Sequence, residues 1–172
     1  MARLPLIFAP DPRLKKVATP VSSVDAPLVG LIDDMLETMY AANGIGLAAP
    51  QVGELQRVIV VDIAGKNEPP QPFGLVNPEI IWADDTLTTY NEGCLSLPEQ
   101  YSDVVRPQAV RVRYLDRHNQ PQEVQADGLL ATVLQHEIDH LNGLLFVDHI
   151  SLLKRNMILR RLKKWKKAGD DV

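Results

Sequence analysis

Residues 136–140 read HEIDH, so that His136 and His140 are four positions apart. On an α-helix this spacing places both imidazoles on one face, where they can bind a single metal ion. Glu137 lies beside that face and can take a proton from a metal-bound water molecule. The pattern therefore indicates metal-assisted hydrolysis, but it leaves the third ligand of the metal undetermined.

The identity of the third ligand separates one class of hydrolase from another. One class uses a third histidine six residues after the second, but position 146 is Phe146, which cannot bind a metal. A second class uses a glutamate from a later helix, and no glutamate follows Glu137. The remaining candidates are Asp148 and His149 downstream and Cys94, the only cysteine of the chain, upstream.

Cys94, the upstream candidate, lies in a segment that could form part of a metal site. It follows Gly93 and precedes a turn at Pro98, and glycine lets the backbone approach a site closely. A thiolate suits zinc or iron, although a lone cysteine is more often a small buried apolar residue. Together with His136 and His140 it would provide three protein ligands and leave one coordination position open, as catalytic zinc sites do.

Length and composition favour a soluble globular protein. The chain has 172 residues, of which 45% are hydrophobic and 23% charged, and we expect one domain spanning residues 1–172. No apolar run approaches the roughly 20 residues of a membrane span, and the N-terminal apolar stretch is too short for a signal peptide. A single cysteine cannot form an internal disulfide, which fits a reducing compartment. We therefore expect a cytoplasmic protein without a membrane span, and a monomer.

The net charge of −4 is unevenly distributed along the chain. Residues 154–172 carry eight basic and two acidic groups, whereas the rest carries ten basic and twenty acidic groups. Ser151 can cap a helix in this region, which we expect over residues 151–168. Its apolar stripe opposite the basic face consists of Ile158, Leu162 and Trp165. By composition alone the basic face is a solvated surface, and contact with RNA is the alternative.

The elements that must position the HEIDH motif follow from periodicity and capping signals. Asp25 and Pro27 start a helix that ends at residues 43–44. Strands are expected over residues 58–63, 75–77, 86–90, 110–114 and 123–125. Asp127 can cap the helix that carries HEIDH, and this helix is apolar on nearly all sides and should be central. The order predicts an α+β fold, with antiparallel or mixed sheets around the HEIDH helix and a further C-terminal helix.

Three segments of the chain resemble the motifs of the peptide deformylase family. They are residues 44–51 (GIGLAAPQ), 92–96 (EGCLS) and 135–140 (QHEIDH). All three are complete and stand in the family's order, and the likeness extends over nearly the whole chain. Two positions depart from the family pattern: Tyr101 stands where a basic residue is frequent, and Val105 where proline is frequent. Of these, Tyr101 bears on the contacts with a peptide substrate.

The resemblance implies removal of the N-formyl group from the N-terminal formylmethionine of newly made polypeptides, with release of formate. The implied ligands of one divalent ion are Cys94, His136 and His140. The family implies Fe²⁺ in the cell, and these ligands also accept Zn²⁺, Ni²⁺ or Co²⁺. Glu137 is implied as general base and acid, and Gln51 and the backbone N–H of Leu95 as donors to the developing oxyanion.

A formylmethionine side chain requires an apolar pocket beside the metal. Leu129 and Val133 lie on the same helix face as His136 and are candidates for lining it, although core packing explains them equally well. The other residues expected to bind substrate are Ile45, Gly46 and Gly93. The glycines are expected because they let a substrate backbone lie close to the chain.

The expected partners are formyl-methionyl nascent peptides, and the basic C-terminal helix is a candidate contact with the ribosome. Two other readings of the sequence stay open. A zinc endopeptidase shares the HExxH pattern and would cleave unformylated peptides. An RNA-binding protein with a structural metal would need a fourth protein ligand, for which His149 and His118 are candidates.

Overall fold

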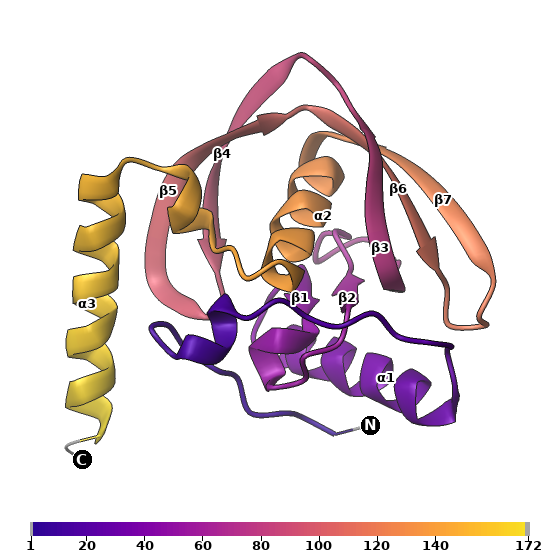
Figure 1. Ribbon diagram of the computed structural model, residues 1–172, viewed down its shortest axis with the longest axis horizontal. Helices are drawn as coiled ribbons and strands as arrows, with labels where there is room; N and C mark the ends of the chain where they lie inside the picture. Colours follow the sequence, from indigo (N-terminus) through magenta and orange to yellow (C-terminus); the bar gives the residue numbers. More distant parts are fainter. Residues whose placement is uncertain (1, 171–172) are drawn as a thin grey trace.

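The computed structural model describes residues 2–170, with side chains as far as residue 166. Met1, Asp171 and Val172, which the predicted domain includes, and the side chain of Lys167, which the predicted basic face includes, lie outside the described residues. Helices and strands follow in the order η1 (Pro12–Lys15), α1 (Ala26–Ala41), β1 (Gly46–Ala48), η2 (Ala49–Val52), β2 (Val58–Val61), β3 (Phe73–Ala83), β4 (Leu87–Cys94), β5 (Leu97–Pro107), β6 (Ala109–Leu115), β7 (Pro121–Asp127), α2 (Gly128–Leu141), η3 (Phe146–His149) and α3 (Leu152–Asp170) (Figure 1).

The strands form two separate sheets. β1, β2, β3, β6 and β7 make a five-stranded sheet in that order, and β4 and β5 make a two-stranded sheet. Every strand pairing among the described residues is antiparallel. α2 lies in the space enclosed by the two sheets, and α3 lies at one side beyond β5 (Figure 1). The predicted α+β class, with sheets around the HEIDH helix and a C-terminal helix, is confirmed.

β2 shows how the larger sheet is covered on both faces. All residues from Val58 to Val61 are fully buried. Ile59 and Val61 belong to the apolar core that includes α2, whereas Val58 and Val60 belong to the core that includes α1. Since successive side chains of a strand point to opposite faces, α1 and α2 pack on opposite faces of the sheet.

α2 is the central helix, with ten of its fourteen residues buried. This agrees with its apolar character on nearly all sides. The predicted cap by Asp127 is wrong, because its side chain makes no capping hydrogen bond. Asp127 is the last residue of β7 and still pairs with Ala109 of β6. Gly128, with a φ of +55°, then turns the chain from the strand into the helix. The cap predicted for α1 is present: the Leu28 N–H donates to Asp25 Oδ1 at 3.0 Å.

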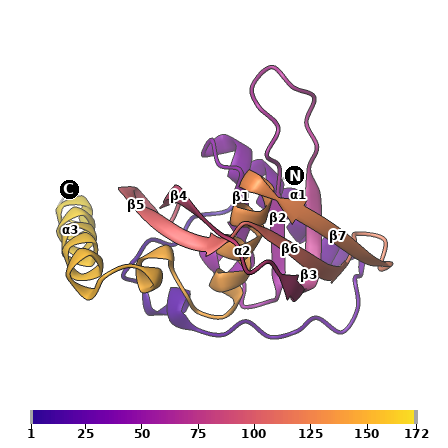
Figure 2. The same cartoon turned by 90° about the horizontal axis from the view of Figure 1, so that it is seen from above.

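Three strands differ most from the sequence prediction. β3 begins at Phe73 and runs to Ala83, well beyond the predicted residues 75–77. β1 has three residues, too few for a periodic signal, and β5 was not predicted at all. The burial of β5 alternates, but its less exposed positions include the polar residues Gln100, Ser102 and Arg106, so the sequence lacks the regular apolar alternation by which half-buried strands are found. The segment between β2 and β3 projects from the body of the molecule (Figure 2).

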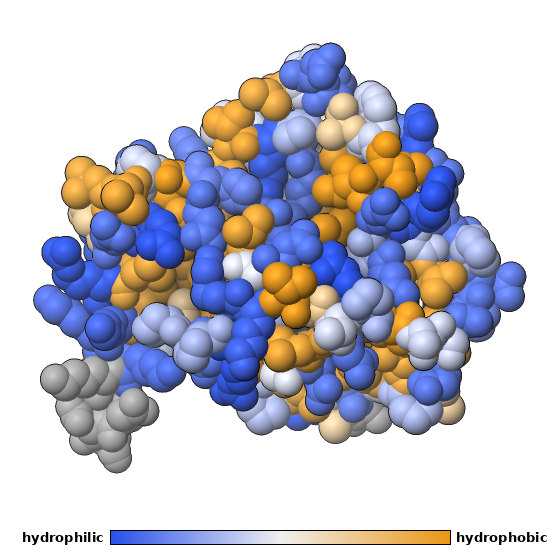
Figure 3. All heavy atoms as spheres, in the orientation of Figure 1, coloured by the Kyte–Doolittle hydropathy of each residue, from blue (hydrophilic) through white to orange (hydrophobic). Residues whose placement is uncertain are grey.

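α3 is attached along a narrow apolar stripe. Ile158 and Leu162 are buried in a core shared with η3 and β5, and the partly exposed Trp165 meets the Phe8 ring edge-on at 5.3 Å between centroids. Ser151 caps the helix, its Oγ accepting the Lys154 N–H at 3.2 Å. Hydrophilic side chains cover much of the visible side of α3, and an apolar group lies over its first turn (Figure 3). Among the described residues, no helix combines the length and apolar character that crossing a bilayer requires.

Candidate active site

The end of β4 and one face of α2 bring three candidate metal ligands together. The ligand atoms of Cys94, His136 and His140 all lie within 4.8 Å of one another. Cys94 Sγ is 3.3 Å from His140 Nε2, and both histidines are buried. One sulfur and two imidazole nitrogens are a donor set that suits zinc and divalent iron. Among the side chains that the structure describes, as far as residue 166, no other group of histidine, cysteine and acidic residues has this geometry.

The protonation of His140 and Glu137 also fits a metal ion. Burial, with a further contribution from the His136 imidazole, lowers the pKa of His140 well below its ordinary value, so that the ring is neutral, the form that binds metals. Burial raises the pKa of Glu137 to about 7. Glu137 Oε1 is buried and has no hydrogen-bond partner among the described residues. A carboxylate in this state is suited to exchanging a proton with a small bound molecule near neutral pH.

A chain of charged side chains, of which Glu92 and Arg106 are buried, holds His136 in place. The His136 Nδ1–H donates to Glu92 Oε1 at 2.9 Å, which leaves Nε2 for a metal. Arg106 binds Glu92 through two nitrogens, at 2.7 and 3.0 Å, and donates to Asp139 at 2.8 Å. Asp139 also accepts from His149 Nε2 at 2.7 Å. Burial alone would raise the pKa of Glu92, but the hydrogen bonds with His136 and Arg106 outweigh it and lower the pKa to about 2.

The other candidate ligands lie outside the cluster. Asp148 accepts from Lys15 at 2.5 Å and from Arg155 at 3.0 Å, and joins the N-terminal segment to the start of α3. His149 is bound to Asp139, and His118 lies in the turn between β6 and β7. Neither His149 nor His118 is therefore placed to act as the fourth protein ligand that a structural metal site would need.

Gln51 faces the cluster from η2 and is 1% exposed. Its Oε1 accepts the Ala48 N–H at 2.9 Å, and its Nε2 donates to Ser96 Oγ at 3.0 Å. The same Nε2 lies 3.6 Å from Cys94 Sγ. Leu95 follows Cys94 at the turn between β4 and β5. The amide of Gln51 is thus held beside the candidate ligands by partners at both of its ends. Ser96, one of these partners, had no role in the sequence analysis.

Two glycines of the motifs are explained by close packing within the protein. A Cβ at position 46 would lie 2.6 Å from Glu137 Oε2 and 2.9 Å from Val133 Cγ1. A Cβ at position 93 would lie 2.5 Å from the ring of Tyr101. The space that a side chain at position 46 would need is therefore taken by Glu137 and Val133, which explains why glycine stands there.

A small cavity of about 130 Å³ opens beside His136. It is lined by Ile45, Tyr90, Asn91, Glu92, Gly93, Leu129, Thr132, Val133 and His136. Four of the predicted substrate-binding residues are in this set. Tyr90 and Asn91 were missed because their place depends on how β4 lies against α2. Thr132 could have been predicted to line the cavity, because it is three residues from Leu129 and lies on the same helix face. Ile45 and Leu129 are 40% and 41% exposed, so the cavity is accessible from solvent.

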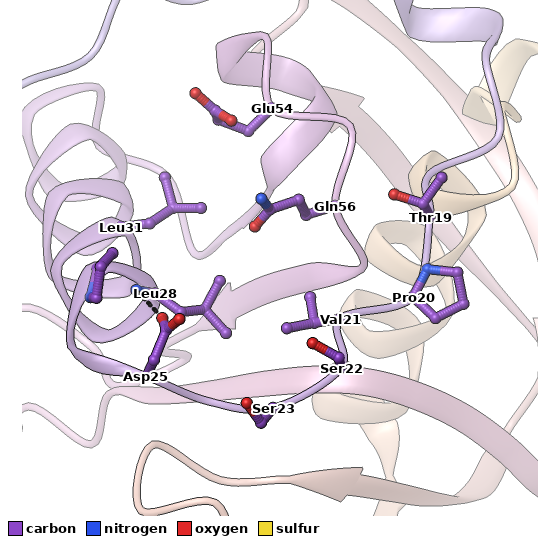
Figure 4. Close-up of a pocket in the computed structure, with 11 residues that line it drawn as sticks. Thr19, Pro20, Val21, Ser22, Ser23, Asp25, Leu28, Leu31, Glu54 and Gln56 are labelled. Carbon is purple, nitrogen blue, oxygen red and sulfur yellow. Dashed lines mark hydrogen bonds between the residues drawn. The ribbon is translucent and has the colours of Figure 1, made fainter.

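A larger hollow of about 490 Å³ lies elsewhere, between the segment around Ser22, α1 and the residues around Glu54 (Figure 4). None of its lining residues belongs to the Cys94 cluster. Its Asp25 carboxylate is already bound to the first turn of α1 (Figure 4). The smaller cavity beside His136 is therefore the better candidate for a substrate pocket.

Comparison with known proteins identifies relatives over most of the chain. The family model described as polypeptide deformylase matches residues 4–156. A peptide deformylase of Mesorhizobium japonicum is 57% identical over 160 residues, which cover 93% of this chain and 91% of that protein. The crystal structure of peptide deformylase from Ehrlichia chaffeensis matches with a TM-score of 0.93 at 37% identity and covers 99% of this chain and 100% of that one. A peptide deformylase structure from Legionella pneumophila matches with a TM-score of 0.90 at 47% identity, covering 98% of both chains.

Proposed function

The chain belongs to the polypeptide deformylase family, whose metal-dependent members remove the N-formyl group from nascent peptides, and we propose that Cys94, His136 and His140 hold the metal for this reaction. The observation that carries the proposal is the close cluster of these three side chains beside the buried, partnerless carboxylate oxygen of Glu137. We propose Fe²⁺ as the ion in the cell, and Zn²⁺, Ni²⁺ or Co²⁺ as ions that the same ligands accept.

A divalent ion held by Cys94, His136 and His140 would supply Lewis-acid chemistry, lowering the pKa of water and polarising a carbonyl group. Glu137 takes a proton from the attacking water and passes it to the leaving amine. A carboxyl group with a pKa of about 7 suits both steps, because it gains and loses the proton near neutral pH. The thiolate of Cys94 leaves less positive charge in the site than a third histidine would, so more of the proton removal falls to Glu137.

Gln51 and Leu95 are proposed to stabilise the oxyanion that forms when water attacks the formyl carbon. The Gln51 amide is oriented in advance by Ala48 and Ser96, so little reorganisation is needed as the charge develops. Losing one such donor typically costs about 3 kcal/mol of transition-state stabilisation.

The methionine side chain of the substrate is proposed to enter the cavity beside His136. Leu129 and Val133 provide apolar walls from α2, and Ile45 provides one from the segment before β1. Gly93 lines the cavity from β4. The cavity adjoins His136, which would place the formyl group of a bound formylmethionine near the metal ligands.

The test is formate release from a formyl-methionyl peptide, with metal content measured on an anaerobic preparation. Glu137→Ala should keep its metal and lose turnover by about two to four orders of magnitude, the usual effect of losing a general base. Cys94→Ala should instead bind the metal weakly. Glu54→Ala, at an exposed acidic position, is the control. Wild-type turnover in Glu137→Ala would contradict the proposed mechanism.

We further propose that the protein acts in the cytoplasm as a monomer, and that the basic face of α3 contacts ribosomal RNA. The exposed Lys163 and Lys164 lie on this face. Removing α3 would uncover the core around Leu162, so charge substitution is the better test. Lys163→Gln with Lys164→Gln should weaken ribosome binding and reduce its salt dependence without changing hydrolysis of short formyl peptides. Arg3→Gln with Lys66→Gln, equal in charge but distant in sequence, is the control, and equal ribosome affinity in both variants would rule the contact out.

A further inference from the structure

A groove of about 300 Å³ lies between the β4–β5 hairpin and α3, apart from the candidate metal ligands. Asn91 of β4 and Tyr101 of β5 line it from the hairpin, and Met157 lines it from α3. All three side chains are exposed, so the groove is open to solvent. In both Figure 1 and Figure 2, β5 is the strand that lies next to α3. The reaction proposed above does not use this groove.

The groove adjoins the cavity beside His136. Asn91 lines both of them. Gly93 lines the cavity, and the ring of Tyr101, which lines the groove, lies against it: a Cβ on Gly93 would be 2.5 Å from that ring. A polypeptide whose first residue occupies the cavity can therefore continue along β4 into the groove. Because an extended chain advances about 3.3–3.6 Å per residue, a few residues are enough to reach it.

Positive charge predominates in the groove. Lys154 and Arg161 line it from α3, and their spacing of seven residues places them on the same face of the helix. Both are exposed, and no salt bridge among the described side chains involves either of them. Asp103 is the one acidic residue of the lining, and its Oδ1 accepts a hydrogen bond from Asn91 Nδ2 at 3.2 Å. Two cations therefore face a single carboxylate.

We propose that this groove binds the part of the nascent peptide that follows the formylmethionine, and that Lys154 and Arg161 favour substrates with an acidic residue there. This inference rests on the proposed function of the cavity beside His136. An acidic side chain matches the excess of cations, and a groove with walls of low dielectric constant strengthens the attraction. Tyr101 and Met157 offer apolar contact to the neighbouring residues of the same peptide. A basic side chain would instead be repelled by two cations.

The experiment measures kcat/KM for formate release from a series of formyl-methionyl octapeptides. Each peptide carries one aspartate, at a different position from the third to the eighth, and is paired with a peptide that has asparagine at that position. The wild type should prefer aspartate by about twofold to fivefold at the one or two positions that reach the groove, the range of an exposed ion pair. Added salt should reduce the preference, because it screens exposed charges.

Charge substitutions in the groove test whether these two residues cause the preference. Lys154→Gln with Arg161→Gln should abolish the preference for aspartate. Lys154→Glu with Arg161→Glu reverses the charge of both positions and should favour lysine over aspartate at the same place in the peptide.

The matched control is Lys163→Glu with Lys164→Glu, which makes the same change of charge on the same helix outside the groove lining. This variant should keep the aspartate preference of the wild type. An equal loss of preference in both charge-reversed variants, or no aspartate preference in the wild type at any position, would overturn the role of the groove. Absence of formate release from every peptide would instead count against the proposed function.

Discussion

The interior next to the proposed metal site and the flank formed by α3 differ in how their charged side chains are surrounded. Behind the site, the side chains of Glu92 and Arg106 are 4% and 6% exposed, and each is bound to fixed partners. Along α3, the charged side chains of Lys163 and Lys164 are exposed. Removing a charge from water is tolerated only where partners replace the water. The interior charges therefore orient the site, whereas those of α3 are available to an external partner.

Loss of Arg106 should produce the largest effect. Arg106→Met keeps much of the side-chain volume but leaves the carboxylates of Glu92 and Asp139 without their common partner. Breaking a buried ion pair in this way typically costs about 3–5 kcal/mol. The free energy of unfolding of the metal-free protein, measured with urea, should fall by this amount. A loss no greater than that of an α3 variant would remove the contrast between the two regions.

A pH series on Glu92 would sharpen the same contrast. The folded-state pKa of Glu92 is about 2, below its ordinary value of 4.5. Its charge therefore contributes stability above about pH 4.5 that is lost as the pH falls toward 2. The difference in unfolding free energy between wild type and Glu92→Gln should be largest at neutral pH and shrink on acidification. Glu79→Gln, at an exposed position, is the control for removing one acidic group. If the difference in unfolding free energy between wild type and Glu92→Gln grew toward acidic pH, the pKa of Glu92 would not be lowered in the folded state.

A smaller effect is expected where α3 meets the body. Hydrogen bonds from the Leu145 N–H, Lys15 and Arg155 outweigh burial and lower the pKa of Asp148. Asp148→Asn removes the charge from two partly exposed ion pairs, which should cost about 1 kcal/mol. Hydrogen exchange of the first turns of α3 should rise more than that of α2. Equal acceleration in both helices would mean that this contact stabilises the whole fold rather than the flank.

The smallest effect is expected at the exposed basic face. Lys163→Gln should change the free energy of unfolding by less than about 0.5 kcal/mol, as surface substitutions usually do. Urea unfolding measures this directly. A larger loss of stability would show that the basic face has a structural role within the chain, and would weaken the case for an external partner.

Local patterns predicted those parts of the site that depend on one helix. The spacing of His136 and His140 implied a shared metal, and Leu129 and Val133 were predicted on the same face, where the structure has them beside the cavity. The cap predicted at Asp127 was wrong, because the strand continues through it. Capping depends on the backbone conformation of the residue before the helix, and the side-chain type alone does not determine that conformation.

The sequence by itself determined the α+β class, the buried central helix, the two histidines with their neighbouring glutamate, and the basic character of the C-terminal helix. These are properties of residue type and short-range spacing. Only the tertiary structure brought Cys94 to 3.3 Å from His140 across 46 positions of chain and paired Arg106 with Glu92 and Asp139. The physical reason is that these contacts depend on how β4 and β5 pack against α2, and strand pairing between distant segments leaves no periodic signal in either segment alone.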